Sequence, residues 1–145
     1  MDDGQHDVIA FLRDPASHPS GAGPVEIIET HASMVFLAGT RAYKLKRAVK
    51  YPYLDFSTLA RRRSACTAEL TLNRRTAPQL YLEVRAISRL TDGRLVWGRP
   101  QGDRSSDLRG DPIDFVVVMR RFDQSDLLEK MADAGGLSAP LLRSD

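Results

Sequence analysis

Short apolar runs separated by turn residues fill the middle of the chain and predict a β-sheet. The runs cover residues 25–29, 34–38, 42–49, 80–88, 95–97 and 113–119. Their lengths are typical of strands, and the tight connections at residues 39–40 and 91–94 predict antiparallel hairpins, because parallel strands need long crossovers. We expect an antiparallel sheet of about five strands, with the very apolar run 113–119 near its centre.

Two segments have helical spacing instead. Apolar residues group on one side of residues 7–12, for which Asp7 is a suitable N-cap. A longer helix is predicted from about residue 58 to residue 76, with Ser57 as its cap and Pro78 just beyond its end. Together these elements predict an α+β fold in which the long helix packs on the sheet.

The same pattern divides the chain into parts. Residues 1–24 form an N-terminal helix and linker, residues 25–122 form the sheet with its long helix, and residues 123–145 form short C-terminal helices. The last helix signal, Ser138-Ala139-Pro140, begins less than two turns before Asp145. We therefore expect the natural fold to continue beyond this chain, which is then a truncated form or a fragment.

Composition narrows the class of protein. The 145 residues are 42% hydrophobic and 28% charged, as in ordinary soluble domains. The net charge of +2 is too small to indicate a nucleic-acid partner, and the single cysteine excludes an intramolecular disulfide. The acidic N-terminus lacks a secretory pattern, and no apolar run approaches the roughly 20 residues of a membrane helix. We expect a cytoplasmic protein without a membrane partner.

A strand that carries lysines is the first candidate for chemistry. Ala42, Lys44 and Lys46 alternate along the run 42–49 and therefore share one face of the strand. This spacing does not decide which of the two lysines is the functional one. Taken alone, the pattern also fits an edge strand with solvated lysines, which is a common defence against aggregation.

Glu69 is a candidate partner for the strand lysine. It lies in or beside the apolar stripe of the long helix. The residues three or four positions away from it are Ala65, Cys66, Leu72 and Asn73. None of them is basic, so the carboxylate has no partner on its own helix. Buried ammonium and carboxylate groups each cost several kcal/mol unless paired, which predicts a pair of Lys44 with Glu69. The alternative is a solvated glutamate at the edge of the stripe.

The long helix also carries two basic clusters, Arg61-Arg62-Arg63 and Arg74-Arg75. Such clusters can contact the phosphates of a nucleic acid. No aromatic residue that could stack on bases is interleaved with them, and no binding motif is present. We favour a solvated basic face and keep nucleic-acid binding through this helix as an alternative.

The order of hairpin, lysine strand, helix with an inward acid, hairpin and apolar strand resembles a kinase N-terminal lobe. The specific resemblance is to the bacterial aminoglycoside phosphotransferase family, in which a protein-kinase-like half is often fused to a P-loop ATPase half. It covers residues from about 25 to 135. The segments that carry it are residues 25–31, 35–39, 42–46, 54–59, 69–75 and 118–122.

The resemblance implies an ATP-binding N-lobe of a small-molecule phosphotransferase. In that reading Lys44 holds the α- and β-phosphates, and Glu69 fixes the orientation of Lys44. Leu37 and Ala42 flank the adenine ring, and Met119 lies behind it. The backbone of the hinge, at Arg120 and Phe122, pairs with the adenine edge.

The chain also departs from the family pattern. The turn at residues 30–33 has no glycine, whereas the kinase turn that covers the phosphates does. No His-x-Asp catalytic loop and no later metal-binding Asp are present, so we expect no catalytic residue here and no activity from this chain alone. Mg²⁺ would bind only with the missing lobe.

The expected partners are ATP and a catalytic lobe, or another chain, that covers the hinge. In the isolated chain the hinge face at residues 119–122 should therefore be exposed and apolar. The alternative to a kinase N-lobe is a non-catalytic α+β module that uses the same fold to bind a partner.

Overall fold

The computed structural model describes residues 3–19, 23–100 and 110–121. Six strands form one sheet in the order β1-β2-β3-β8-β6-β7, and every neighbouring pair is antiparallel. They are Glu26–Glu29 (β1), Ser33–Ala38 (β2), Arg41–Lys46 (β3), Tyr81–Arg89 (β6), Leu95–Pro100 (β7) and Asp111–Arg120 (β8). The predicted α+β class is confirmed. All six apolar runs of the sequence are strands of this sheet, which is one strand more than the number expected.

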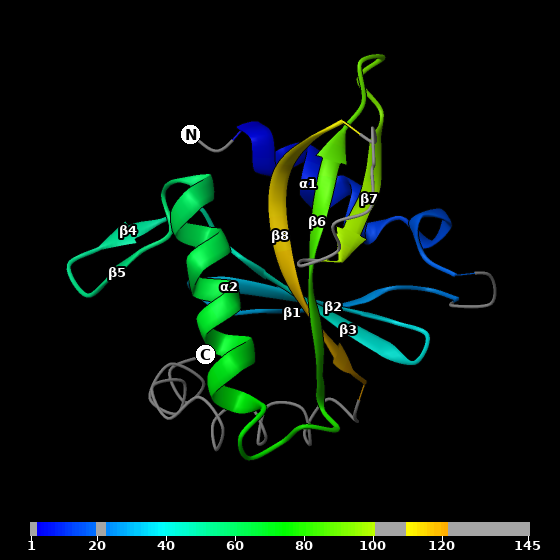
Figure 1. The fold of residues 1–145 in the computed structure, drawn as a ribbon. Coiled ribbons are helices and arrows are strands. Elements are labelled where there is room, and N and C mark those ends of the chain that lie inside the picture. Colours follow the sequence, from blue (N-terminus) through cyan, green and yellow to red (C-terminus); the bar gives the residue numbers. More distant parts are fainter. Residues whose placement is uncertain (1–2, 20–22, 101–109, 122–145) are drawn as a thin grey trace.

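Two helices cover opposite faces of this sheet (Figure 1). The helix α2 (Leu59–Asn73) packs on one face, where Cys66 is fully buried among side chains of β2, β3, β6 and β8. The helix α1 (Asp3–Arg13) packs on the other face through Val8 and Leu12, and the short turn η1 (Pro15–Ser17) follows it. The sheet is therefore the middle layer of three.

Helix and strand ends differ from the predicted ones by a few residues. Asp7 lies inside α1 rather than at its N-cap. The cap of α2 is Thr58, whose hydroxyl accepts a hydrogen bond from the Arg61 N–H at 3.2 Å, while Ser57 bonds to Asp55 instead. The strand β3 ends at Lys46 rather than at residue 49, because the chain turns there to form new backbone bonds.

The tyrosine-rich segment after β3 forms a small hairpin of β4 (Lys50–Tyr51) and β5 (Leu54–Asp55). It projects from the body of the molecule beside the N-terminal end of α2 (Figure 1). The rings of Tyr51 and Tyr53 stack at 5.8 Å, and Nε2 of His31 lies 3.0 Å from the Tyr53 hydroxyl. These contacts join the hairpin to the turn between β1 and β2.

The described part of the chain contains no helix that is both long and apolar enough to cross a membrane. The C-terminal helices predicted within residues 123–145, and the hinge residue Phe122, lie outside the described residues.

Candidate functional site

The lysine strand β3 lies inside the sheet, between β2 and β8. Lys44 is opposite Val35 on one side and Val117 on the other. Because side chains alternate along a strand, Lys44 and Lys46 both point to the face that α2 covers. They are 7% and 6% exposed, respectively. The alternative of an edge strand with solvated lysines is therefore wrong.

Glu69 contacts both of these lysines with its two carboxylate oxygens. Nζ of Lys44 lies 3.1 Å from Oε2, and Nζ of Lys46 lies 2.6 Å from Oε1. The predicted contact between Lys44 and Glu69 is confirmed, and the second lysine shares the same carboxylate. The Glu69 side chain is only 13% exposed, so the alternative of a solvated glutamate is wrong. We call Lys44, Lys46 and Glu69 the lysine cluster.

The three charges of the lysine cluster change one another's pKa. Burial acts to raise the pKa of Glu69, but the two ammonium groups outweigh it and lower that pKa to about 2. Burial acts to lower the pKa of Lys46, yet its contact with Glu69 prevails and raises it. For Lys44, burial prevails over the attraction of Glu69, and repulsion by Lys46 adds to it, so the pKa is lowered. Lys44 is thus the less compensated of the two cations.

A second buried ion pair joins α2 to the sheet. Nε of Arg62 lies 3.0 Å from Oδ1 of Asp114, whose side chain is fully buried in β8. Arg62 also donates a hydrogen bond to the Phe56 carbonyl at 3.0 Å. The expectation of a solvated basic face is therefore wrong for Arg62, because its side chain is buried against Asp114.

The N-terminal helix contributes to the same network through Gln5. Its amide donates to Oδ2 of Asp114 at 2.9 Å and to the Lys46 carbonyl at 2.8 Å, and it accepts from the Ala48 N–H at 2.8 Å. Sequence reasoning missed Gln5, Arg62 and Asp114. Asp114 was the available signal, since a carboxylate inside the apolar run 113–119 requires a buried partner.

Arg74 fixes the other end of α2. Its guanidinium donates to the backbone carbonyls of Tyr81 and Leu82 in β6. With Arg62 near one end and Arg74 at the other, the helix is fastened to the sheet on both sides of Glu69. This is the local reason why Glu69 lies over β3. Arg61 and Arg63 of the same helix are exposed, as expected.

Three of the residues predicted to contact adenine are neighbours in the sheet. Leu37 pairs with Ala42, and Ala42 pairs with Met119, on the same face as Lys44. Their side chains are 1% exposed or less. The structure therefore brings them together beside the lysine cluster, but a base could reach them only if the surrounding side chains moved.

The hinge does not have the exposed apolar face that we expected. Met119 is fully buried, because it packs in the core under α2, and Arg120 is the exposed residue next to it. Arg121 is partly exposed and pairs with Glu26 at 3.2 Å. The expectation of an exposed apolar hinge face is therefore wrong at Met119. Phe122 lies outside the described residues.

The turn between β1 and β2 is closed by its own hydrogen bonds. The Ser33 N–H donates to the Thr30 hydroxyl at 3.2 Å, and the Thr30 N–H donates to the Ser33 carbonyl at 2.9 Å. These two donors are therefore already used and do not point at a ligand. This geometry gives no support to a phosphate contact by the Ser33 backbone N–H.

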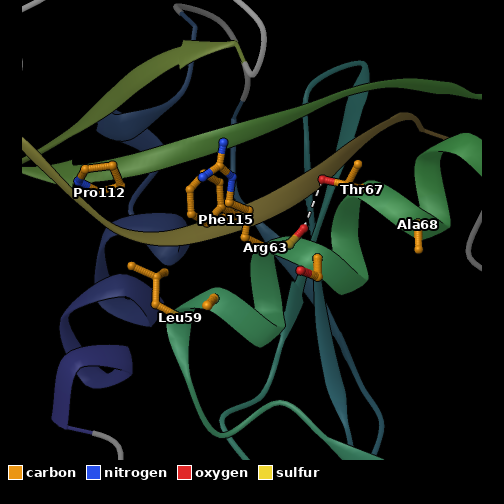
Figure 2. Close-up of a pocket in the computed structure, with 8 residues that line it drawn as sticks. Leu59, Arg63, Thr67, Ala68, Pro112 and Phe115 are labelled. Carbon is orange, nitrogen blue, oxygen red and sulfur yellow. Dashed lines mark hydrogen bonds between the residues drawn. The ribbon is translucent and has the colours of Figure 1, made fainter.

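A separate groove of about 700 Å³ lies between α2 and the first half of β8 (Figure 2). The Arg63 guanidinium lies 5.5 Å from the centre of the Phe115 ring, and both side chains line the groove. None of its lining residues belongs to the predicted ATP contacts. In the described part of the chain no three His, Cys, Asp or Glu side chains gather as metal ligands.

Comparisons with known proteins give relatives without a described activity. Uncharacterized proteins of Mycobacterium bovis and of two strains of Mycobacterium tuberculosis each share 37% identity with this chain over 120 residues. No family model matches the chain, and no solved structure matches it. The match covers 82% of this chain and 20% of each relative, so the chain spans about a fifth of the length of the curated relatives it matches.

Proposed function

We propose that this chain is the ATP-binding N-lobe of a kinase-like small-molecule phosphotransferase. The observation that carries the proposal is the buried contact of 3.1 Å between Lys44 on β3 and Glu69 on α2. In protein kinases a strand lysine and a helix glutamate form such a pair, and the lysine holds the nucleotide phosphates. Burying two charges carries a desolvation cost, which the contact between Lys44 and Glu69 offsets.

The neighbourhood of the pair supports the same proposal. An apolar row crosses the three central strands two residues along β3 from Lys44. It consists of Leu37, Ala42 and Met119. Two residues along a strand span about 7 Å, which is within the reach of a nucleotide from base to phosphate. An ammonium beside a flat apolar row suits an adenine nucleotide, provided that the row becomes accessible.

In the proposal, this chain and a further lobe supply different parts of the active site. They supply cations for phosphates, but they contain no acidic cluster for Mg²⁺. In the proposal the catalytic base and the Mg²⁺ ligands therefore belong to a further lobe. About four-fifths of each mycobacterial relative lies outside the matched part, which leaves room for such a lobe in them. The complete protein would transfer the γ-phosphoryl group of ATP to a hydroxyl group of its substrate.

The test is ATP binding by the purified chain, measured by isothermal titration calorimetry. Lys44→Met should weaken ATP binding by at least about tenfold, which corresponds to about 1.4 kcal/mol. Lys50→Met is the matched control, because Lys50 is an exposed lysine on the neighbouring hairpin, and it should bind like the wild type. Circular dichroism of each variant establishes that it is folded. Equal affinity of the wild type and Lys44→Met, or no binding by either, would overturn the proposal.

A non-catalytic partner-binding module is the second candidate. The closed turn between Thr30 and Ser33 favours it, since the backbone N–H groups of these two residues already have partners within the turn. The burial of Leu37, Ala42 and Met119 favours it as well, because these side chains are not accessible to a base. The same titration separates the two functions, because a module of this kind has no reason to bind ATP through Lys44.

A further inference from the structure

The lysine cluster has one positive charge in excess. Two ammonium groups meet a single carboxylate, and all three side chains are at most 13% exposed. The other titratable groups that face the cluster do not supply a second anion. Burial raises the pKa of the Cys66 thiol to about 12 and also raises the pKa of the Tyr81 hydroxyl, so both stay neutral.

Among the described residues Asp114 is the other buried acid, and its carboxylate already has partners. Its two carboxylate oxygens take hydrogen bonds from Arg62 and from Gln5. It therefore balances the Arg62 guanidinium rather than a lysine. An unbalanced charge in a buried site is strongly unfavourable, which makes the excess of one cation a feature that needs an explanation.

The two lysines are not held equally. The Lys46 ammonium is closer to Glu69, at 2.6 Å against 3.1 Å for Lys44. It also lies 5.1 Å from the centre of the Phe56 ring, a distance at which the ring face attracts a cation. The backbone carbonyl of Lys46 is held by Gln5 as well. Lys46 is thus fixed at its ammonium and at its backbone.

Lys44 has fewer attachments. In the part of the chain that the structure describes, Glu69 is the polar partner recorded for its ammonium. Its neighbours across the sheet are Val35 and Val117, which offer no hydrogen-bonding side chain. The Lys44 ammonium can therefore exchange one oxygen of Glu69 for an oxygen of a ligand at little cost to the cluster.

We propose that Lys46 is the permanent counter-ion of Glu69, and that Lys44 is the surplus cation that a phosphate oxygen of the ligand neutralises. The identity of the ligand rests on the proposed function, whereas the assignment of the counter-ion does not. Lys46 is then a positioning residue. It holds one oxygen of the Glu69 carboxylate, so that only the other oxygen contacts Lys44, and it does not touch the ligand.

The first test uses the chain without ligand. Lysine labelled with ¹³C at Cε allows NMR to follow the titration of Lys44 and Lys46 separately. Lys44 should titrate at a lower pH than Lys46, and Lys46→Met should raise the pKa of Lys44 by about one unit or more, because Glu69 then pairs with Lys44 alone. Lys50→Met should change neither. The reverse order of titration in the wild type would overturn the assignment, even if Lys46→Met did not fold.

The second test adds a ligand, with ATP and inorganic tripolyphosphate as probes. Lys46→Met should weaken both by about tenfold. Lys46→Arg keeps the cation and should stay within about threefold of the wild type. Unchanged affinity in Lys46→Met would overturn the positioning role. If the wild type bound neither probe, the proposed function would fail, while the ligand-free titration would still decide which lysine is the counter-ion.

Discussion

Glu69 reaches Lys44 at 3.1 Å through one carboxylate oxygen and Lys46 at 2.6 Å through the other, so one acid on α2 serves two bases on β3. The lysines are 25 and 23 positions away from it along the chain. Because the carboxylate is shared, removal of the glutamate should destabilise the fold more than removal of either lysine. Loss of one lysine leaves a neutral pair, whereas loss of the glutamate leaves two buried cations together.

That inequality predicts the stability of two variants. Glu69→Leu should lower the free energy of unfolding by about 3–5 kcal/mol, because it leaves buried charges without a partner. Lys44→Met should lower it by less than about 1.5 kcal/mol, because Lys46 still neutralises Glu69 and Met fills a similar volume. Equilibrium unfolding in urea measures both. Equal losses in the two variants would mean that Glu69 depends on Lys44 and not on Lys46.

The lowered pKa of Glu69 predicts a dependence of stability on pH. Its pKa falls from 4.5 in the unfolded chain to about 2 in the folded one. The stabilisation is therefore complete above about pH 4.5 and is lost as the pH falls toward 2, by an amount on the order of 3 kcal/mol. Urea unfolding at about pH 5 and at about pH 3 should show the larger part of this loss in the wild type, about 2 kcal/mol. Glu69→Gln should lack it, and Glu29→Gln, which changes an exposed acid, should keep it.

The buried pair of Arg62 and Asp114 predicts strong coupling between α2 and β8. Asp114→Leu and Arg62→Met should each cost about 3–5 kcal/mol, because each leaves its partner charged and buried. The double variant should cost clearly less than the sum of the two. A double-mutant cycle in urea measures the coupling. Additive losses would contradict a direct interaction between these two side chains.

Two glycines with similar backbone angles predict different costs on substitution. Gly93 and Gly110 have φ values of +94° and +93°. A Cβ at Gly93 would meet no atom within 4 Å, so Gly93→Ala should cost only the strain of a positive φ, about 1 kcal/mol. A Cβ at Gly110 would overlap the Arg89 carbonyl oxygen, so Gly110→Ala should cost several kcal/mol more. Melting temperatures of the two variants should separate them clearly.

The sequence was informative about the fold because alternation along short apolar runs reports which face each side chain occupies. The same alternation places Lys44 on the sheet face that α2 covers. Glu69 has no basic neighbour on its own helix, which indicated a partner on the sheet such as Lys44. The contact of Lys44 with Glu69 was predictable for that reason. The contact of Lys46 with the same carboxylate was not predictable, since the sharing depends on where the carboxylate lies between the two ammonium groups.

Other features depend on packing that no local pattern records. Gln5 lies more than a hundred positions from Asp114, and nothing near Gln5 in the sequence indicates a buried amide. Ser57 and Thr58 are adjacent hydroxyl residues, so the sequence did not indicate which one caps α2. The burial of Met119 follows from the close packing of β8 under α2, which the expectation of an exposed hinge did not include.

Labelling of lysines by an acyl phosphate derivative of ATP tests the nucleotide site most directly. A lysine at the phosphates attacks the acyl carbonyl, which forms an amide and releases ATP. Mass spectrometry of the chain then identifies the acylated residue. The proposed function predicts labelling at Lys44 that excess ATP suppresses, while the exposed Lys50 is labelled to the same extent with or without ATP. Labelling that spares Lys44, or that excess ATP does not change, would contradict a nucleotide at the lysine cluster.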